Sequence, residues 1–245
     1  QRLKELQQKV KKAGKRRNFA KSTIQRWIRL GTIPLEIAQS FNLKYSELAE
    51  YKVSHNSQSL PLEIKLDEDM LTFVGLWIAD GCYDRVSVIM SVSSKEEQGL
   101  VRRVAKKFNF PTKKHSDKFS LMIHSHTFKF LMKDLLELKG NAFTKRIPGW
   151  VFSLSNKQIG WLLKGLFSGD GHAGKQEIVI SLSSRKLLED IQTLLLNFGI
   201  ILRIGSQHKK DKTYPGRISS LKFWESFKDI GFLQKVKKER LEQLC

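Results

Sequence analysis

The chain has few of the residues that cross-link or interrupt a fold. It contains two cysteines, Cys82 and Cys245, and five prolines among 245 residues. Two cysteines are too few for a disulfide framework or a cysteine-based zinc cluster, so an intracellular, reducing setting is expected. No apolar run reaches the roughly 18–20 residues of a membrane-spanning helix, and the basic N-terminus lacks the apolar core of a signal peptide.

Acidic residues are also scarce relative to basic ones. The chain has 24 acidic and 44 basic residues, a net charge of +20, and 40% of its residues are hydrophobic, enough for a folded core. The excess is spread along the chain: residues 1–60 carry a net +9 and residues 61–245 a net +11. A polyanionic partner is expected, and without a membrane segment that partner is nucleic acid touched at more than one place.

The chain repeats itself at an offset of 90 positions. Residues 73–81 read FVGLWIADG and residues 163–171 read LKGLFSGDG. The same offset aligns further identities without a gap: Ser91, Ser93 and Ser94 with Ser181, Ser183 and Ser184, and Phe108 with Phe198. So many identities at one offset predict two similar halves.

Each half has the pattern of an α+β unit, with one sheet face packed on helices and the other solvated. The apolar motif helices are expected at 68–80 and 156–170, the second with Asn156 as N-cap. Alternating strands are expected around 86–92, 119–124 and 178–182, with Phe119, Leu121 and Ile123 on one face of the second. Amphipathic helices are expected at about 94–108, 127–138, 184–198 and 221–230.

Small residues at a spacing of four mark both motif helices. Gly75 and Ala79 in one helix, and Gly165 and Gly169 in the other, would form flat strips that let two helix backbones pack closely across a pseudo-two-fold axis. Each helix then ends in Asp-Gly. The glycine is expected to adopt the left-handed cap conformation.

The aspartates Asp80 and Asp170 lie where the helix dipole disfavours negative charge, and packing of the helices would add mutual repulsion. Two carboxylates beside helix-end carbonyls form a hard oxygen site that suits Mg²⁺, which can activate water and stabilise the leaving oxygen in phosphodiester cleavage. The alternative is an ordinary turn aspartate. Two copies at matched positions on a basic chain favour the metal site.

The paired motifs resemble those of LAGLIDADG homing endonucleases in their single-chain form, over about residues 61–245. The resemblance implies two pseudo-symmetric αββαββα lobes with β-saddles that straddle a long double-stranded DNA site, in a protein that acts as a monomer. It implies Mg²⁺-dependent double-strand cleavage that leaves short 3′ overhangs. Two or three divalent ions at the lobe interface would be held by Asp80, Asp170, Ala79 and Gly169.

Two lysines are further catalytic candidates by the same resemblance. KRIPGW resembles the family's Lys-x-Ile-Pro stretch and nominates Lys145, while IGFLQKVKKERL resembles the family's ending and nominates Lys237, with Lys235 and Lys238 as neighbours. A basic group near the scissile phosphate could stabilise developing charge. Plain phosphate contact or solvated charge remains the alternative for both.

The DNA-reading surface is expected on the strand faces opposite the core and on the hairpin QHKKDKTYPGR. Phosphate contacts would position the protein and base contacts would specify the sequence. The candidates are Arg85, Ser87, Ser91, Lys113, Lys114, Lys118, Ser120, His124, Lys175, Glu177, Ser181, His208, Lys209, Lys210, Lys212 and Arg217.

The first 53 residues resemble a small all-α helix-turn-helix unit in which STIQRWIR is the recognition helix. Its DNA-facing residues would be Lys21, Ser22, Gln25, Arg26 and Arg29; a helical bundle with a solvated basic face is the alternative. Residues 54–61 are expected to be a linker, 62–152 the first lobe and 153–245 the second. An intein, intron-encoded or free-standing origin stays open.

Two other functions fit the same fold. Some relatives are RNA maturases, and some bacterial transcription regulators carry decayed motifs beside a helix-turn-helix. The presence of both acidic residues favours the endonuclease and leaves maturase activity possible.

Overall fold

The computed structural model describes residues 8, 19–30, 52–55, 58–61, 63–117 and 119–245. The chain forms two compact units, one of residues 1–53 and 61–63 and the other of residues 54–60 and 64–245. Among the described residues, no helix combines the length and the apolar character needed to cross a membrane.

In the N-terminal unit the structure describes the helix α2 (Lys21–Leu30). This confirms a helix at the predicted STIQRWIR segment. Ile24 is buried, and the Trp27 ring packs edge-on against Phe19 with 5.0 Å between centroids. The remaining predicted helices of a helix-turn-helix lie outside the described residues. Strands β1 (Lys52–His55) and β2 (Gln58–Pro61) pair in a two-stranded sheet, so the segment predicted as a linker contains regular structure.

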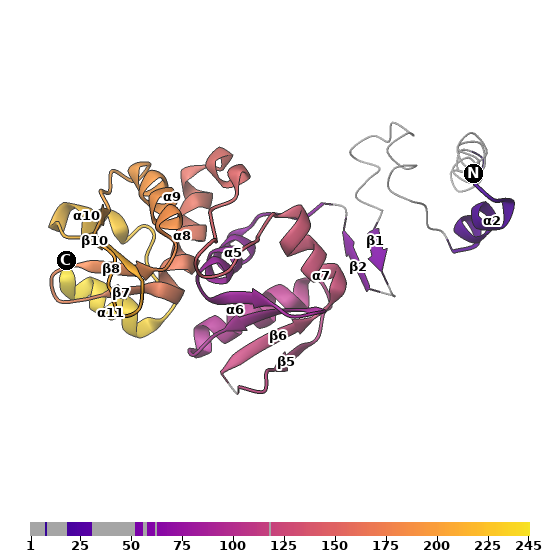
Figure 1. Cartoon of the computed structure of the whole chain (residues 1–245), viewed down its shortest axis with the longest axis horizontal. Coiled ribbons are helices and arrows are strands. Elements are labelled where there is room, and N and C mark those ends of the chain that lie inside the picture. Colours follow the sequence, from indigo (N-terminus) through magenta and orange to yellow (C-terminus); the bar gives the residue numbers. More distant parts are fainter. Residues whose placement is uncertain (1–7, 9–18, 31–51, 56–57, 62, 118) are drawn as a thin grey trace. The chain divides into compact units, whose positions relative to one another are not determined.

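The larger unit contains two lobes of the order αββαββα, as predicted (Figure 1). The first comprises α5 (Glu68–Asp80), β3 (Gly81–Tyr83), β4 (Ser87–Ser91), α6 (Lys95–Lys107), β5 (Thr112–Lys114), β6 (Ser120–His124) and α7 (His126–Phe130), which continues as a π-helical turn over Leu131–Leu135. The second comprises α8 (Asn156–Asp170), β7 (Gly171–Ala173), β8 (Ile178–Leu182), α9 (Arg185–Leu196), β9 (Arg203–Ile204), β10 (Tyr214–Ile218) and α10 (Leu221–Phe227). A 3₁₀ turn (Gly149–Ser153) precedes α8, and α11 (Lys235–Leu244) follows α10.

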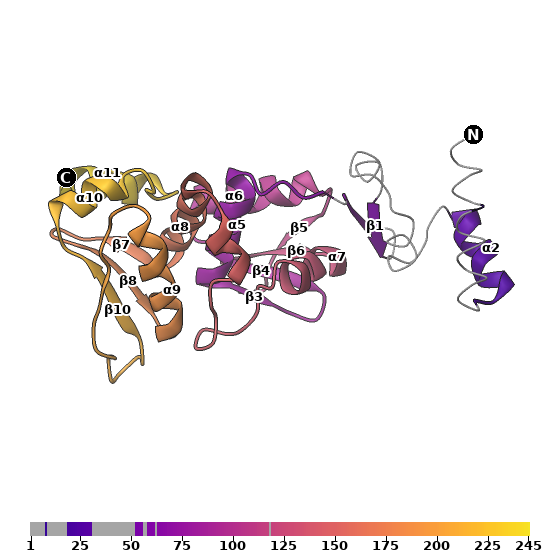
Figure 2. The same ribbon diagram turned by 90° about the horizontal axis from the view of Figure 1, so that it is seen from above.

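Each lobe has one four-stranded antiparallel sheet, in the order β3-β4-β6-β5 or β7-β8-β10-β9 (Figure 2). Alternating residues of β4 and β6, such as Val88, Met90 and Ile123, are buried in the core beside the helices. Phe119 was expected on this apolar face and is instead 74% exposed, because β6 begins one residue later and Phe119 belongs to the preceding turn.

The repeat is visible in how the helices begin. Ser94 caps α6 by accepting from Glu97 N, and Ser184, 90 positions later, caps α9 by accepting from Leu187 N. The N-cap of α8 is Ser155 rather than the predicted Asn156, because the Ser155 hydroxyl accepts from Gln158 N and the Gln158 side chain accepts in return from Ser155 N, a capping box.

The two motif helices pack backbone to backbone through their glycines. A Cβ added to Gly75 would lie 1.9 Å from the Leu162 carbonyl oxygen, and one on Gly165 would lie 1.9 Å from the Thr72 carbonyl oxygen. The predicted glycine strips are therefore confirmed, and the two contacts are related by the 90-residue repeat.

The glycines that follow the aspartates are needed for space and not for a left-handed conformation. Gly81 and Gly171 are extended, with φ of −90° and −89°. A Cβ on Gly81 would lie 2.2 Å from the Trp77 ring, and one on Gly171 would lie 2.5 Å from the Phe167 carbonyl oxygen. The expected left-handed caps are thus wrong.

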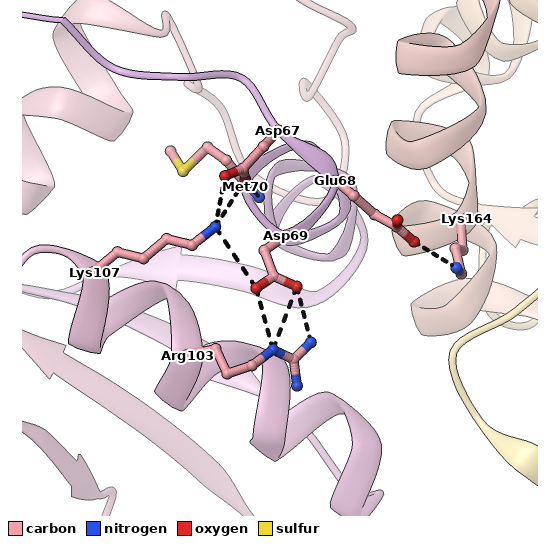
Figure 3. Close-up of polar contacts among 7 residues, drawn as sticks. All are labelled: Asp67, Glu68, Asp69, Met70, Arg103, Lys107 and Lys164. Carbon is pink, nitrogen blue, oxygen red and sulfur yellow. Dashed lines mark hydrogen bonds and ion pairs between the residues drawn. The ribbon is translucent and has the colours of Figure 1, made fainter.

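Ion pairs surround the start of α5 (Figure 3). Asp69 accepts a forked bond from Arg103 of α6, and Lys107 lies 2.8 Å from Asp67. On another side, Glu68 pairs with Lys164 of α8 at 2.9 Å, which joins the two lobes at this end of the helix pair. These side chains are partly or largely exposed, so each pair contributes little stability by itself.

Candidate active site at the paired helix ends

The close packing of α5 and α8 brings the two motif aspartates to one end of the helix pair. A Cβ on Gly169 would lie 2.4 Å from Ala79 Cβ and 3.4 Å from Asp80 Oδ2, so the Asp80 carboxyl lies directly beside the last turn of α8. Asp170 follows Gly169, and its charge interacts with that of Asp80. The predicted meeting of Asp80 and Asp170 at the lobe interface is what the structure shows.

Without a bound metal, the surroundings of both carboxyl groups favour the protonated form over the charged form and so raise the pKa of each. Burial, together with the neighbouring Asp80 charge, raises the pKa of Asp170 to about 7 against the opposing effect of Lys145 and Lys237. Asp80 still reaches solvent, but burial of its carboxyl among the helix ends also raises its pKa. Two acids held this way form a site that favours an added cation.

Lys145 closes the end of α5. Its Nζ donates to the carbonyl oxygens of Trp77 at 3.0 Å, Ala79 at 3.2 Å and Gly81 at 2.8 Å, and it lies 4.7 Å from the Trp77 ring centroid. An ammonium group has three N–H donors, so these bonds use all of them. Burial lowers the pKa of Lys145, while Asp170 and Asp80 act to raise it.

Lys237 occupies the corresponding place at the end of α8. Its Nζ donates to the Ser168 carbonyl oxygen at 2.5 Å and lies 5.8 Å from the Phe232 ring centroid. Burial lowers the pKa of this lysine too, while Glu97 and the two aspartates act to raise it. Of the candidate lysines in this segment, Lys237 is the one that bonds the end of α8. Lys235 also lines the pocket, but it is exposed, as is Lys238.

An open pocket reaches Asp80 from solvent. Its lining comes from both halves of the chain and includes Asp80, Ser93, Glu97, Gly169, Gln234 and Lys237. Among the described residues, no group of three or more histidine, cysteine or acidic side chains is placed to hold a metal. A cation here would therefore bind two carboxylates and complete its shell with backbone, water or substrate oxygens, as Mg²⁺ commonly does.

Most of the predicted DNA-contacting side chains of the lobes are exposed. The exposed set is Arg85, Ser91, Lys113, Lys114, His124, Lys175, Ser181, His208, Lys209, Lys210 and Lys212. In α2, Lys21, Ser22, Gln25, Arg26 and Arg29 are all exposed as well. These side chains provide basic and hydrogen-bonding surface in both units.

Four predicted contact residues are buried or half-buried and have partners inside the protein, and one cannot be placed. Ser87 is fully buried with its hydroxyl 3.0 Å from His124 Nδ1, and the Ser120 hydroxyl donates to a carboxylate oxygen of the preceding turn at 2.8 Å. Glu177 and Arg217 form an ion pair with each other. Lys118 lies outside the described residues.

Sequence reasoning missed four side chains that organise the site, which form two pairs. Buried Glu97 accepts from Gln234 Nε2 at 2.6 Å, and buried Asp190 accepts from Arg146 at 2.6 and 2.7 Å. The sequence did give one signal for the two acids. The repeat marks Ser94 and Ser184 as matched helix starts, and each acid lies within the first two turns of the helix that follows.

The fold and this site define a two-lobed α+β protein with paired acidic helix ends. Residues 157–231 match the family model described as LAGLIDADG-like domain. A structure of I-DmoI in complex with DNA and Ca aligns with a TM-score of 0.55 at 16% identity, covering 72% of this chain and 98% of that chain. Full-length DUF199/WhiA from Thermatoga maritima aligns with a TM-score of 0.50 at 17% identity, covering 74% of this chain and 59% of that one. The chain therefore has the LAGLIDADG fold.

Sequence relatives carry the similarity inside much longer proteins. The DNA-directed RNA polymerase subunit Rpo1C of Methanocaldococcus jannaschii is 28% identical over 232 residues, 86% of this chain and 26% of that protein. The DNA polymerase II large subunit of Thermococcus kodakarensis is 28% identical over 197 residues, 69% of this chain and 11% of that protein. The chain thus spans about a quarter or less of the length of these relatives.

Proposed function

We propose that this protein is a site-specific homing endonuclease that makes a divalent-metal-dependent double-strand break in a long DNA target and leaves short 3′ overhangs. The observation that carries the proposal is the meeting of Asp80 and Asp170 at the ends of two glycine-packed helices. Burying two like charges there is unfavourable without a cation, so the arrangement has a stability cost that a catalytic function explains.

Mg²⁺ fits the donor set of this site. Asp80 and Asp170 would hold it, with the backbone of Ala79 and Gly169 as further ligands, and two or three ions would share the interface. When bound, such ions supply Lewis-acid stabilisation and a more acidic water at a phosphodiester. The Ala79 carbonyl already accepts from Lys145, which fixes its direction at the helix end.

The lysines supply positive charge beside each helix end. Lys145 has all its N–H groups bonded to α5 and β3 carbonyls, so it acts on a nearby phosphate through its charge alone. Lys237 makes one hydrogen bond among the described residues, so it has N–H groups available for a phosphate oxygen or a water. Both lysines offset the negative ends of the helix dipoles beside the aspartates.

The exposed basic side chains of the two lobes form one proposed DNA-binding surface, and those of α2 in the N-terminal unit form another. Since one chain supplies both motif helices, a monomer can place one helix end near each strand of a duplex. The complex of I-DmoI with DNA and Ca supports this partner and a divalent cofactor.

An intein-type origin is supported by the sequence relatives. A polymerase subunit, a DNA polymerase and an aminotransferase have unrelated activities, yet each contains a similar stretch that occupies only 11–26% of its length. A shared stretch inside unrelated hosts is the pattern of an inserted mobile element rather than of a host function.

A DNA-binding regulator is the second candidate, because the exposed basic face of α2 and the likeness to DUF199/WhiA suit it. A regulator has no need for two buried acids at one helix-pair end, so the retained Asp80 and Asp170 favour the endonuclease.

Cleavage selection from a randomised DNA library with Mg²⁺ tests the proposal and separates the two candidates. The endonuclease should enrich one long site cut on both strands, and chelation of the metal should stop cutting. Selective binding of a site with no cleavage in Mg²⁺ or Mn²⁺ would support the regulator instead.

A further inference from the structure

The two segments that carry the site lysines each cross from one lobe to the other. Residues 145–147 follow the first lobe, and residues 233–237 follow the second lobe's last sheet and helix. Each lysine side chain reaches the motif helix of its own lobe, while its neighbours in sequence bind the opposite lobe. The contacts that hold the two segments to the opposite lobes do not involve Asp80 or Asp170.

The first segment is fixed to α9 of the second lobe. The Arg146 guanidinium donates to both carboxylate oxygens of Asp190, at 2.6 and 2.7 Å, and Ile147 N donates to Asp190 Oδ2 at 3.1 Å. Ser184 Oγ donates to the Lys145 carbonyl oxygen at 3.0 Å. The backbone of Lys145 is thus held by the second lobe while its Nζ caps α5 of the first.

The second segment is fixed to α6 of the first lobe. Gln234 Nε2 donates to Glu97 Oε1 at 2.6 Å and to the Ser168 carbonyl oxygen at 2.8 Å, and Lys235 N donates to Glu96 Oε1 at 3.3 Å. The Ser168 carbonyl also accepts from Lys237 Nζ. Gln234 therefore connects the first lobe to the same carbonyl that Lys237 caps.

Glu97 is built for this role and not for metal binding. Its Oε2 accepts from Ser93 N at 3.1 Å and Ser94 N at 3.0 Å, and its Oε1 accepts from Gln234. Both oxygens are occupied, and the side chain is buried. The position that corresponds to Glu97 in the second half is Leu187, so the second half uses Asp190 for its tether instead.

We propose that Glu97 and Asp190 are positioning residues that act across the lobe interface, Glu97 on Lys237 through Gln234, and Asp190 on Lys145 through Arg146. This inference rests on the proposed endonuclease function. The strands of a duplex are related by local two-fold symmetry, so a pseudo-two-fold protein presents one lysine to each strand. Weakening one tether therefore slows cleavage of one strand, and weakening the other slows the opposite strand.

The decisive variants keep the size of each side chain. In Glu97→Gln, the carbonyl oxygen can still accept from Ser93 and Ser94. The new amide group either opposes the Gln234 amide as donor against donor or makes that amide turn over and lose its bond to the Ser168 carbonyl oxygen. Asp190→Asn likewise places an amide against the Arg146 guanidinium. Because Asp190 is buried and its loss could unfold the protein, Arg146→Gln is the milder second variant, and Gln234→Met is its partner for the other tether. Glu189→Gln, an exposed carboxylate next to Asp190, is the matched control.

The experiment follows nicking of each end-labelled strand of the selected DNA site and, separately, amide hydrogen exchange of the full protein without DNA. Loss of a hydrogen bond of this kind should change the ratio of the two strand rates by about three- to tenfold. Glu97→Gln and Gln234→Met should bias the ratio one way, Asp190→Asn and Arg146→Gln the other, and Glu189→Gln should leave it unchanged. Exchange should rise at 233–240 in the first pair and at 145–150 in the second.

Equal slowing of both strands, a bias toward the same strand in both pairs, or unchanged exchange at the two segments would overturn the crossed tethers. If the wild type cuts no DNA while exchange changes as expected, the tethers stand and the endonuclease proposal fails. Normal cutting with an unchanged strand ratio in all four variants would leave the endonuclease standing and remove the positioning role.

Discussion

The ends of α5 and α8 carry the same aspartate at matched positions but are stabilised differently. Lys145 is buried, bonds three carbonyl oxygens at the end of α5, and is tethered by the charged pair of Arg146 and Asp190. Lys237 is only partly buried, bonds one carbonyl oxygen at the end of α8, and is tethered through an amide, Gln234. The repeat therefore duplicates the acids, while the basic groups around them are held by different means.

This difference separates two kinds of residue in the site: the aspartates, which both helix ends share, and the lysines, each of which belongs to one helix end. The carboxylates lie together at the interface, so a change in either should affect both ends. Each lysine is bound to one helix, so a change in it should affect one end more than the other. Variants of both kinds of residue test that division, beginning with the largest expected effect.

Replacing either aspartate should remove the site as a whole. Asp80→Asn and Asp170→Asn should each slow double-strand cleavage by at least about a hundredfold, because each removes a carboxylate needed for metal binding. DNA affinity should change little. Cleavage of the selected site and binding in Ca²⁺ measure the two properties, and Asp134→Asn, an exposed acid outside the site, is the control. Full double-strand cutting by either variant would contradict the assignment.

Closing the gap between the helices should damage both ends equally. Gly75→Ala and Gly165→Ala each place a Cβ 1.9 Å from a carbonyl oxygen of the facing helix, so each should cost about 3 kcal/mol or more of unfolding free energy. Chemical denaturation measures the loss. Gly99→Ala in α6 is the control: its Cβ would lie 3.6 Å from the nearest atom, an Arg103 side-chain nitrogen, and it should stabilise the helix by about 0.5–1 kcal/mol. Similar stability of all three variants would refute the close packing.

Much of the helix pair and its acidic end was predictable from sequence, because each of these features follows from a short local pattern that occurs twice. The helix bounds at Glu68–Asp80 and Asn156–Asp170, the glycine strips and the meeting of the aspartates all follow from an aligned repeat. The use of Lys145 as a helix cap did not follow, because its carbonyl partners lie 64 to 68 residues away. Gln234 and Glu97 are 137 residues apart, and no periodicity predicts a single contact at that distance.

The raised pKa of Asp170 predicts a pH-dependent stability in the metal-free protein. A carboxyl whose pKa is raised from 3.8 to about 7 by burial favours the protonated folded state, so wild-type stability falls as pH rises through this range. Asp170→Asn carries no such charge and should be more stable than wild type by about 2–3 kcal/mol above pH 7, after allowance for remaining solvent exposure. Below a pH of about 4 the difference should vanish, because the carboxyl is then protonated in both the folded and the unfolded state.

Urea denaturation from about pH 4 to about pH 8 with a chelator present measures this effect, and added Mg²⁺ should stabilise only the wild type. A wild type that stays more stable than Asp170→Asn at the alkaline end of this range without metal would show that Asp170 is not held as a disfavoured anion.

Lys145 should contribute more to the free energy of unfolding than Lys237 does. Lys145→Met removes three hydrogen bonds to carbonyl oxygens and should cost about 2 kcal/mol of unfolding free energy, whereas Lys237→Met loses one bond and should cost about 1 kcal/mol. Lys235→Met, an exposed neighbour, is the control and should change stability little. Thermal and urea unfolding give the order, and an equal cost for Lys145 and Lys237 would remove the contrast between the two ends.

The smallest effect is expected from α2, which lies outside both ends. Arg26→Gln removes one exposed charge and should weaken DNA binding by a few-fold, with a decrease of about one in the slope of log affinity against log salt. The ratio of the two strand rates should not change. Titration of the selected site at several salt concentrations measures the slope. Identical slopes for Arg26→Gln and wild type would show that this helix does not contact phosphate.

The most direct test of a shared carboxylate site is a double-mutant comparison of strand nicking. The nicking rate of each strand is measured for the wild type, Asp80→Asn, Asp170→Asn and the double variant on the selected target in Mg²⁺. One shared site predicts that each single variant loses nicking of both strands and that the double variant is no slower than either. If each single variant instead nicked one strand at the wild-type rate, and only the double variant lost both activities, the aspartates would serve two independent sites and the shared carboxylate site would be wrong.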